Sequence, residues 1–373
     1  MAKNVGIRDE TLDFTVVYST SPATAAAAFT RNTFCGHPVT VGRVHVADGR
    51  LQAVVVNSKN ANVATGPEGL EACRETCRLV GAELGIRPED VFPCSTGVIG
   101  RPLPMERMRA GIAGVRSQLA PGRLDAFARA ILTTDTHPKM RCAQLGNAVL
   151  SGCCKGAGMI EPNMATMLAF FFTDAALPAD ELRAALREAV EVSFNMVSVD
   201  SDTSTSDTAV VLANGQAGAV DRHAFRRLLT AMAVELAQEV ARDGEGASKL
   251  IEVAVSGAPD RDAARRVAKS VVNSPLVKSA AWGADPNWGR VAMAVGKCFD
   301  LPLDPDRVRI AFGGIAVYPG GGLGPDGLGP LTEHLRGDRI RIEVDLALGD
   351  ASATVWGCDL TPEYVHINGD YTT

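Results

Sequence analysis

The sequence is poor in aromatic residues, has no excess of basic residues and contains no long hydrophobic run. Aromatic residues make up 5% of the 373 residues, and the formal net charge is −6. Nucleic-acid binding usually needs a basic face, and single-strand binding adds stacking aromatic side chains, so we expect no nucleic-acid partner. The longest apolar stretch, residues 164–172, is far shorter than the ~18 residues of a membrane helix, so we expect no membrane partner.

Signs of secretion and of a metal site are also missing. Residues 1–14 hold no apolar run of the kind found in signal peptides. The nine cysteines are an odd number in a long chain, which argues against a disulfide framework and favours a reducing, cytoplasmic compartment. Cys73 and Cys77 could share one helix face, but no second pair of ligands stands at zinc spacing. We therefore expect structural thiols and no metal.

The order of apolar and polar residues predicts interleaved strands and helices. Thr65 is a candidate N-cap of the first of these helices, and Gly85 is suited to its C-terminal end. The interleaving indicates an α/β or α+β fold, although periodicity does not choose between parallel and antiparallel sheets. The expected strands are residues 51–56, 91–94, 166–172, 208–212, 250–255, 308–318 and 340–348; the expected helices are 67–83, 182–192 and 225–240; and 263–269 and 291–297 are ambiguous.

A glycine-rich stretch resembles a dinucleotide fingerprint only superficially. Gly322, Gly324 and Gly327 satisfy the G-x-G-x-x-G pattern. That fingerprint needs a preceding strand and a helix that opens at the glycines, and Pro325 interrupts the helix start. We therefore expect no nicotinamide or other dinucleotide cofactor, and in fact no cofactor at all.

The polar run 200–207 is rich in oxygen ligands but does not match a calcium loop. An EF-hand loop needs glycine at its sixth position and glutamate at its twelfth, where this chain has Thr205 and Val211. The plain interpretation is a loop whose hydroxyl groups bind backbone groups. A role in lining a substrate site is the alternative.

The segment 155–168 combines several unusual features. Gly156 and Gly158 permit uncommon backbone angles, Pro162 restricts the chain, and Thr166 stands at the start of an expected strand. A threonine hydroxyl becomes a useful nucleophile when a base is adjacent, and a free α-amine on the same residue is one such base. Cleavage of the Ala165–Thr166 bond would generate that amine. The residues alone only permit this chemistry, and by themselves they favour an ordinary strand entrance.

This segment resembles the self-processing site of the ornithine acetyltransferase family, also called glutamate N-acetyltransferases, which are bifunctional in arginine biosynthesis. The resemblance implies a layered αββα sandwich shared with certain self-processing aminopeptidases. It also implies a dimer of αβ units (α2β2). The resemblance follows nearly the whole chain in order, through residues 21–25, 29–32, 60–62, 95–100, 133–136, 155–168, 202–208, 243–247, 273–278, 285–290 and 371–373.

The resemblance also implies a reaction and a set of site residues. The precursor would break between Ala165 and Thr166 into an α chain of residues 1–165 and a β chain of residues 166–373. Thr166 would accept an acetyl group from an N-acetylated amino acid such as N-acetylornithine and pass it to an amine such as glutamate, without a cofactor. The matching oxyanion-hole positions are Thr96 and Gly97, and the matching substrate-binding positions are Thr134, Lys155, Glu245, Asn368 and Thr373.

Two departures from the family pattern leave the substrates open. Lys59 stands where the family commonly has glycine, and Glu161 stands where many members have a smaller or apolar residue. Both resemble the branch found in specialised-metabolite clusters, such as that for clavulanic acid. Two alternatives therefore accompany the acyltransferase hypothesis. One is an amidohydrolase that uses water as the acceptor, and the other is an unprocessed, non-catalytic paralogue that binds an amino acid.

Overall fold

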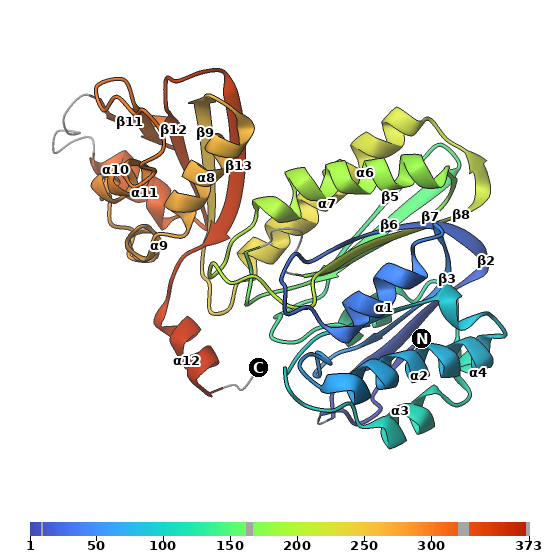
Figure 1. Ribbon diagram of the computed structural model, residues 1–373. Coiled ribbons are helices and arrows are strands. Elements are labelled where there is room, and N and C mark those ends of the chain that lie inside the picture. The colour runs from blue at the N-terminus through green and yellow to red at the C-terminus, as the bar shows by residue number, and fades with distance from the viewer. Residues whose placement is uncertain (9, 162–166, 320–327, 371–373) are drawn as a thin grey trace. The chain divides into compact units, whose positions relative to one another are not determined.

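The computed structural model describes residues 1–8, 10–161, 167–319 and 328–370, and the chain forms two compact units (Figure 1). The first unit contains residues 1–195 and 202–236. The second contains residues 196–201 and the described residues from 237 onward. No described helix is both long enough and apolar enough to cross a lipid bilayer.

The first unit is built on an eight-stranded mixed sheet. Its strand order is β4-β3-β2-β8-β7-β6-β5, with β1 added beside β2. The β3–β4 and β7–β8 pairs are parallel, whereas the other pairs are antiparallel. The strands are β1 (Ala2–Lys3), β2 (Phe14–Phe29), β3 (Arg50–Asn57), β4 (Val91–Ser95), β5 (Lys139–Leu145), β6 (Ala148–Lys155), β7 (Leu168–Ala176) and β8 (Thr208–Ala219).

The long strand β2 joins two halves of this sheet. Residues 14–18, 23 and 24 pair with β3, and its last six residues, 24–29, pair with β8. The register shifts between Tyr18 and Ala23, where the strand contains Pro22. Such irregularities bend a strand and increase its twist. The sheet therefore changes direction along β2, and its two halves pack against each other.

The main core lies between these two halves. Val54 and Phe92 from one half share a buried cluster with Phe170 and Val210 from the other. Phe127 of α5 (Leu124–Ala130) closes this cluster, and its ring meets that of Phe170 edge-on with 4.9 Å between centroids. Each such buried aromatic side chain stabilises the fold by roughly 1.5–3 kcal/mol relative to an exposed one.

Helices cover both outer faces of the sandwich, as Figure 1 shows. On one side, Val55 of β3 packs with Cys77 of α2 (Gly66–Leu84) and Met108 of α3 (Met105–Ile112). On the other side lie α6 (Ala179–Val192) and α7 (Arg222–Arg242). The predicted mixed α/β class and the αββα layering are therefore confirmed. Two further helices of this unit are α1 (His37–His45) and α4 (Val115–Gln118).

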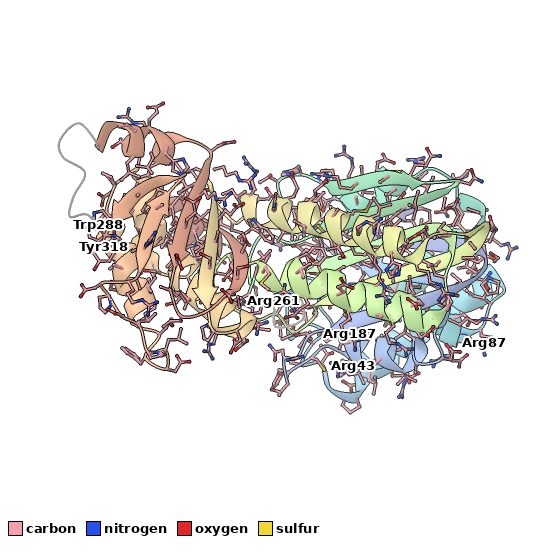
Figure 2. The ribbon with its side chains drawn as sticks, turned by 90° about the horizontal axis from the view of Figure 1, so that it is seen from above. Arg43, Arg87, Arg187, Arg261, Trp288 and Tyr318 are labelled. Carbon is pink, nitrogen blue, oxygen red and sulfur yellow. The ribbon has the colours of Figure 1, made fainter. Side chains whose placement is uncertain are left out.

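The second unit has a five-stranded sheet with the order β11-β10-β12-β9-β13. Helix α8 buries its apolar face on β9 and β13, and the Asp260 side chain caps it by accepting from the Ala263 N–H. Trp288 stacks on Tyr318 with ring centroids 5.4 Å apart (Figure 2). The elements are β9 (Leu250–Ala258), α8 (Arg261–Val272), α9 (Pro275–Trp282), α10 (Trp288–Gly296), β10 (Arg309–Phe312), β11 (Ile315–Tyr318), α11 (Leu328–Arg336), β12 (Arg339–Asp345), β13 (Ala351–Cys358) and α12 (Pro362–Asp370).

Most local predictions are confirmed, and two are wrong. Gly85 ends α2 with φ +71°, as expected. Thr65 occupies the N-cap position of α2, but its hydroxyl accepts no hydrogen bond from the first N–H groups of the helix and instead donates to Asn62 Oδ1 (2.9 Å). The expected strand 308–318 is two strands, β10 and β11, separated by Gly313 and Gly314. Gly322, Gly324 and Gly327 of the dinucleotide-like pattern lie outside the described residues.

Most cysteines of the first unit are buried in its core, whereas Cys35 is half-buried and Cys142 is exposed. Cys73 and Cys77 lie on the buried face of α2. A hydrogen bond with Cys73 and burial together raise the pKa of the Cys77 thiol well above its usual range, and burial raises that of Cys94. A raised thiol pKa disfavours the reactive thiolate. Among the described residues, no group of histidine, cysteine and acidic side chains is arranged to hold a metal ion.

Candidate active site

The turn that follows β4 is fixed by hydrogen bonds to the neighbouring strand. Because β3 and β4 are parallel, their carboxyl ends lie at the same edge of the sheet. Ser95 Oγ donates to Asn57 Oδ1 (2.5 Å), and the Thr96 N–H donates to the Asn57 carbonyl (3.1 Å). The predicted pair Thr96 and Gly97 therefore stands on a rigid support.

Gly97 occupies a position that only glycine fits. Its φ is +128°, a backbone conformation that other residues rarely adopt. A Cβ atom there would lie 2.3 Å from the carbonyl carbon of Lys59 and 2.6 Å from the Asn60 nitrogen. The turn is thus packed directly on the backbone of residues 59–60, and any side chain at this position would displace it.

Lys155 reaches this turn from the end of β6. Its Nζ donates to Thr96 Oγ1 at 3.2 Å, although 59 residues separate the two in sequence. Both side chains are buried, with 8% of each residue exposed. The structure therefore brings together three of the residues that the sequence predicted for one site: Thr96, Gly97 and Lys155.

Asp135 links two parts of this site, and sequence analysis did not single it out. Its Oδ1 accepts from the Gly156 N–H (2.6 Å) and from Lys139 Nζ (2.7 Å), and its Oδ2 accepts from the Thr133 N–H (3.2 Å). The half-buried Thr134 lies in the loop that Asp135 closes. The carboxylate thus ties the Thr134 loop to the end of the strand that carries Lys155. The sequence signal that could have identified Asp135 is its position four residues before Lys139, with which it forms an ion pair.

The Asp135 carboxyl is ionised despite complete burial. Burial alone would raise its pKa. Two effects outweigh burial and hold the pKa at about 2: the positive charges of Lys139 and Lys155, and the hydrogen bonds from Lys139 and the Gly156 N–H. The folded pKa is below the unfolded value of ~3.9. The ionised carboxylate therefore stabilises the fold above about pH 4, and this contribution is lost as the pH falls towards 2.

We expect Lys139→Met to destabilise the protein strongly. Neither Lys139 nor Asp135 exposes any side-chain area, so the substitution removes the lysine partner of a buried carboxylate. Breaking such a pair costs about 3–5 kcal/mol of unfolding free energy, measured by urea denaturation. The matched control is Glu71→Gln, which breaks the exposed Arg78–Glu71 pair and should cost less than about 1 kcal/mol. Equal losses in the two variants would contradict this account of the buried pair.

The part of the polar run 200–207 that belongs to the first unit, from Asp202 onward, leads to hydrogen bonds on both sides of the predicted cleavage segment. The Glu161 N–H donates to the Asp202 carbonyl (2.8 Å), and Thr203 Oγ1 donates to the Glu161 carbonyl (2.9 Å). Beyond the segment, the Thr208 N–H donates to the Met167 carbonyl (3.0 Å). The interpretation of this run as a loop whose hydroxyls bind backbone groups is confirmed. The predicted cleavage residues Ala165 and Thr166 lie outside the described residues.

Two further predicted residues meet in the second unit. Asn368 Nδ2 of α12 donates to Glu245 Oε2 at 2.8 Å, across 123 positions of sequence. Glu245 is buried, with 7% of the residue exposed, whereas Asn368 is exposed. Thr373, the last predicted site residue, lies outside the described residues. The structure thus brings Glu245 and Asn368 together as neighbours.

The sandwich and its cluster of Thr96, Gly97 and Lys155 define a layered α/β protein with a candidate active site at the edge of its sheet. The sequence profile of the ArgJ family matches residues 1–373. The chain belongs to the ArgJ family.

Named relatives and a solved structure agree with this assignment. The chain is 47% identical over 371 residues to the arginine biosynthesis bifunctional protein ArgJ 2 of Clostridium acetobutylicum, covering 99% of this chain and 96% of the relative. It is 51% identical over 375 residues to the glutamate N-acetyltransferase Oat2 of Streptomyces clavuligerus, covering 99% and 95%. A crystal structure of the arginine biosynthesis bifunctional protein ArgJ from Bacillus halodurans matches with a TM-score of 0.52 and 39% identity, covering 55% of this chain and all of that one.

Proposed function

We propose that this protein is a self-processing N-acetyltransferase that moves an acetyl group from an N-acetylated amino acid to the amine of another. The family resemblance implies N-acetylornithine as the donor, and the name of the glutamate N-acetyltransferase relative supports glutamate as the acceptor. The observation that carries the proposal is the cluster of Thr96, Gly97 and Lys155 at the edge of the sheet. We place its activity in the cytoplasm.

Self-cleavage supplies the nucleophile and its base on one residue. Cleavage of the Ala165–Thr166 bond frees the α-amine of Thr166, whose ordinary pKa is ~7.7–8.0, so that a useful fraction is neutral near pH 7.5. This amine accepts the hydroxyl proton as Thr166 Oγ1 attacks the acetyl carbonyl carbon. The C–N bond then breaks, the proton passes to the departing amine, and the acetyl group remains on Oγ1 as an ester.

The second half of the reaction reverses these steps with a new amine. The acceptor amine attacks the ester carbon, the C–O bond breaks, and the hydroxyl of Thr166 regains its proton. Both halves pass through a tetrahedral oxyanion, which rigid donors at Thr96 and Gly97 would stabilise. The packing of Gly97 on residues 59–60 supports this role, because preorganised donors cost no rearrangement during the reaction.

Charge complementarity assigns the two ends of an amino-acid substrate. Lys155 suits the carboxylate and Glu245 suits the amine, through charge-assisted hydrogen bonds. Burial of both side chains strengthens such contacts relative to water. Thr134, Asn368 and Thr373 complete the proposed substrate-binding set.

The sheet order supports two chains that stay together after cleavage. Residues 1–165 would contribute β1 to β6, and residues 166–373 would contribute β7 and β8 to the same sheet. Because β7 and β8 lie between β2 and β6, the two chains would interleave in one sheet. The whole Bacillus halodurans chain matches 55% of this chain. A β chain of 208 of the 373 residues would be a fragment of about that size. We propose that two such αβ units form the native α2β2 particle.

Acceptor dependence tests the proposed reaction. With N-acetylornithine as donor, we expect ornithine to be released and N-acetylglutamate to form in equal amounts, with a rate that rises with glutamate concentration. Mass spectrometry of both products measures the transfer. Ornithine and acetate released at a rate independent of glutamate would indicate an amidohydrolase. Binding of the amino acid with no product would indicate a non-catalytic paralogue and overturn the proposal.

A further inference from the structure

Lys59 has a backbone conformation that disfavours its own side chain. Its φ is +72°, in the left-handed region where a residue other than glycine pays a steric penalty. Such penalties persist where the surrounding structure imposes them, and they gather at functional sites. A glycine would occupy this position without strain. The side chain of Lys59 is therefore the feature that needs an explanation.

Lys59 lies directly beneath the Thr96–Gly97 turn. A Cβ atom built at Gly97 would overlap the Lys59 carbonyl carbon, so the two backbones are in direct contact. The Val98 N–H also donates to the Lys59 carbonyl at 3.3 Å. In the other direction, Lys59 Nζ donates to the Leu132 carbonyl at 2.9 Å, two residues before Thr134. Its backbone supports one part of the site, and its ammonium group lies beside another.

The ammonium group of Lys59 belongs to a positively charged cluster. Burial lowers the pKa of Lys59 most, and the positive charges of Lys155 and Arg8 lower it further. The negative charges of Asp135 and Asp13 raise it. Lys59, Lys139 and Lys155 thus place three ammonium groups in the field of the Asp135 carboxylate, and Arg8 and Asp13 add one further charge of each sign near Lys59.

Lys59 itself keeps hydrogen-bonding capacity for a ligand. An ammonium group has three donors, and the one recorded hydrogen bond of Lys59 goes to the neutral Leu132 carbonyl. It forms no ion pair with any carboxylate of the described part of the chain. The residue as a whole is half-buried and not fully enclosed. An anion placed there would meet both Lys59 and the positive field of Lys155.

We infer that Lys59 is a specificity-determining residue that binds a second, side-chain carboxylate of a dicarboxylic amino-acid substrate. This inference rests on the proposed function, in which Lys155 takes the first carboxylate. A lysine on a flexible stem binds a carboxylate as a point charge. The carboxylate can belong to a free acceptor such as glutamate or to an N-acetylated donor such as N-acetylglutamate, and its chemistry is the same in both.

Paired substrates that differ only in this carboxylate test the inference. We expect Lys59→Met to lower kcat/KM for glutamate by about 10-fold or more, mainly through KM, because a charge-assisted hydrogen bond is lost. The value for glutamine, its amide, should change less than about 2-fold. A parallel comparison of N-acetylglutamate with N-acetylglutamine as donors shows which substrate carries the recognised carboxylate. Equal changes for acid and amide in both pairs, or no change in either, would overturn the inference.

Two further variants separate recognition from folding. Lys59→Gly relieves the backbone strain, so it should fold at least as well and still lose the preference for the acid. Lys297→Met makes the same side-chain change at an exposed lysine and should keep the preference. A preference retained in Lys59→Gly would contradict the assignment.

A binding measurement distinguishes failure of this inference from failure of the proposed function. Isothermal titration calorimetry with N-acetylglutamate and N-acetylglutamine needs no turnover. The wild-type protein should bind the acid more tightly, and Lys59→Met should bind both alike. Equal affinities in the wild-type protein would refute recognition of a carboxylate on the N-acetylated donor even if acetyl transfer occurs. A preference for the acid that depends on Lys59 would support the subsite even if no transfer is found.

Discussion

Replacement of Thr166 by alanine is expected to leave the chain uncut and inactive. The wild-type protein should give two fragments, of 165 and 208 residues, whereas Thr166→Ala should give one species of 39.1 kDa. The substitution removes the hydroxyl that would both start cleavage and carry the acetyl group. Loss of a covalent nucleophile lowers the turnover rate by roughly 10⁴-fold or more. Intact-mass spectrometry measures the cleavage, and N-acetylglutamate formation measures the transfer.

Thr20→Ala is the matched control for this experiment. Thr20 is exposed on β2, where its hydroxyl accepts a hydrogen bond from Gln216 Nε2, so this variant should be cut and active like the wild type. The wild-type fragments should also co-elute in gel filtration, because their strands interleave in one sheet. A single 39.1 kDa species in the wild type would remove the free Thr166 amine and with it the proposed mechanism.

Gly97→Ala is expected to cause the next largest loss of activity. The new methyl group would overlap the backbone of Lys59 and Asn60, so the turn that holds Thr96 must move. Displacement of an oxyanion donor lowers kcat by about 10²–10³-fold. We expect this loss in steady-state acetyl transfer, measured on purified, fully cut protein so that the effect on cleavage is counted separately.

Gly100→Ala separates the effect of the clash from that of backbone strain. Gly100 also has a positive φ, +80°, but a Cβ there would have no atom within 4 Å. This variant should lose some stability, of the order of 1 kcal/mol, and keep kcat within a few-fold of the wild type. If both variants lose kcat to the same extent, close packing of the turn on residues 59–60 does not position the oxyanion donors.

The elements that sequence predicted well are those whose own residues determine them. Helix α2 has Pro67 in its first turn, a periodic apolar face and Gly85 at its end, and the expected span 67–83 differs little from the observed Gly66–Leu84. Strand β3 is a run of β-branched residues and was equally clear. The strand β2 was not predicted, because its second half is alanine-rich and it contains Pro22. Pairing with both β3 and β8 keeps it extended.

The sequence by itself determined the family resemblance, the layered α/β class and the residues Thr96, Gly97 and Lys155. Only the tertiary structure decided that Lys155 contacts Thr96, that Asp135 holds the Gly156 N–H, and that Lys59 lies under Gly97. These contacts join positions far apart in the chain, and they depend on strand order, register and the direction of each loop. The order of apolar and polar residues along the chain indicates which side chains face a core. Which polar groups come together at the edge of the sheet depends on how its strands are ordered and paired.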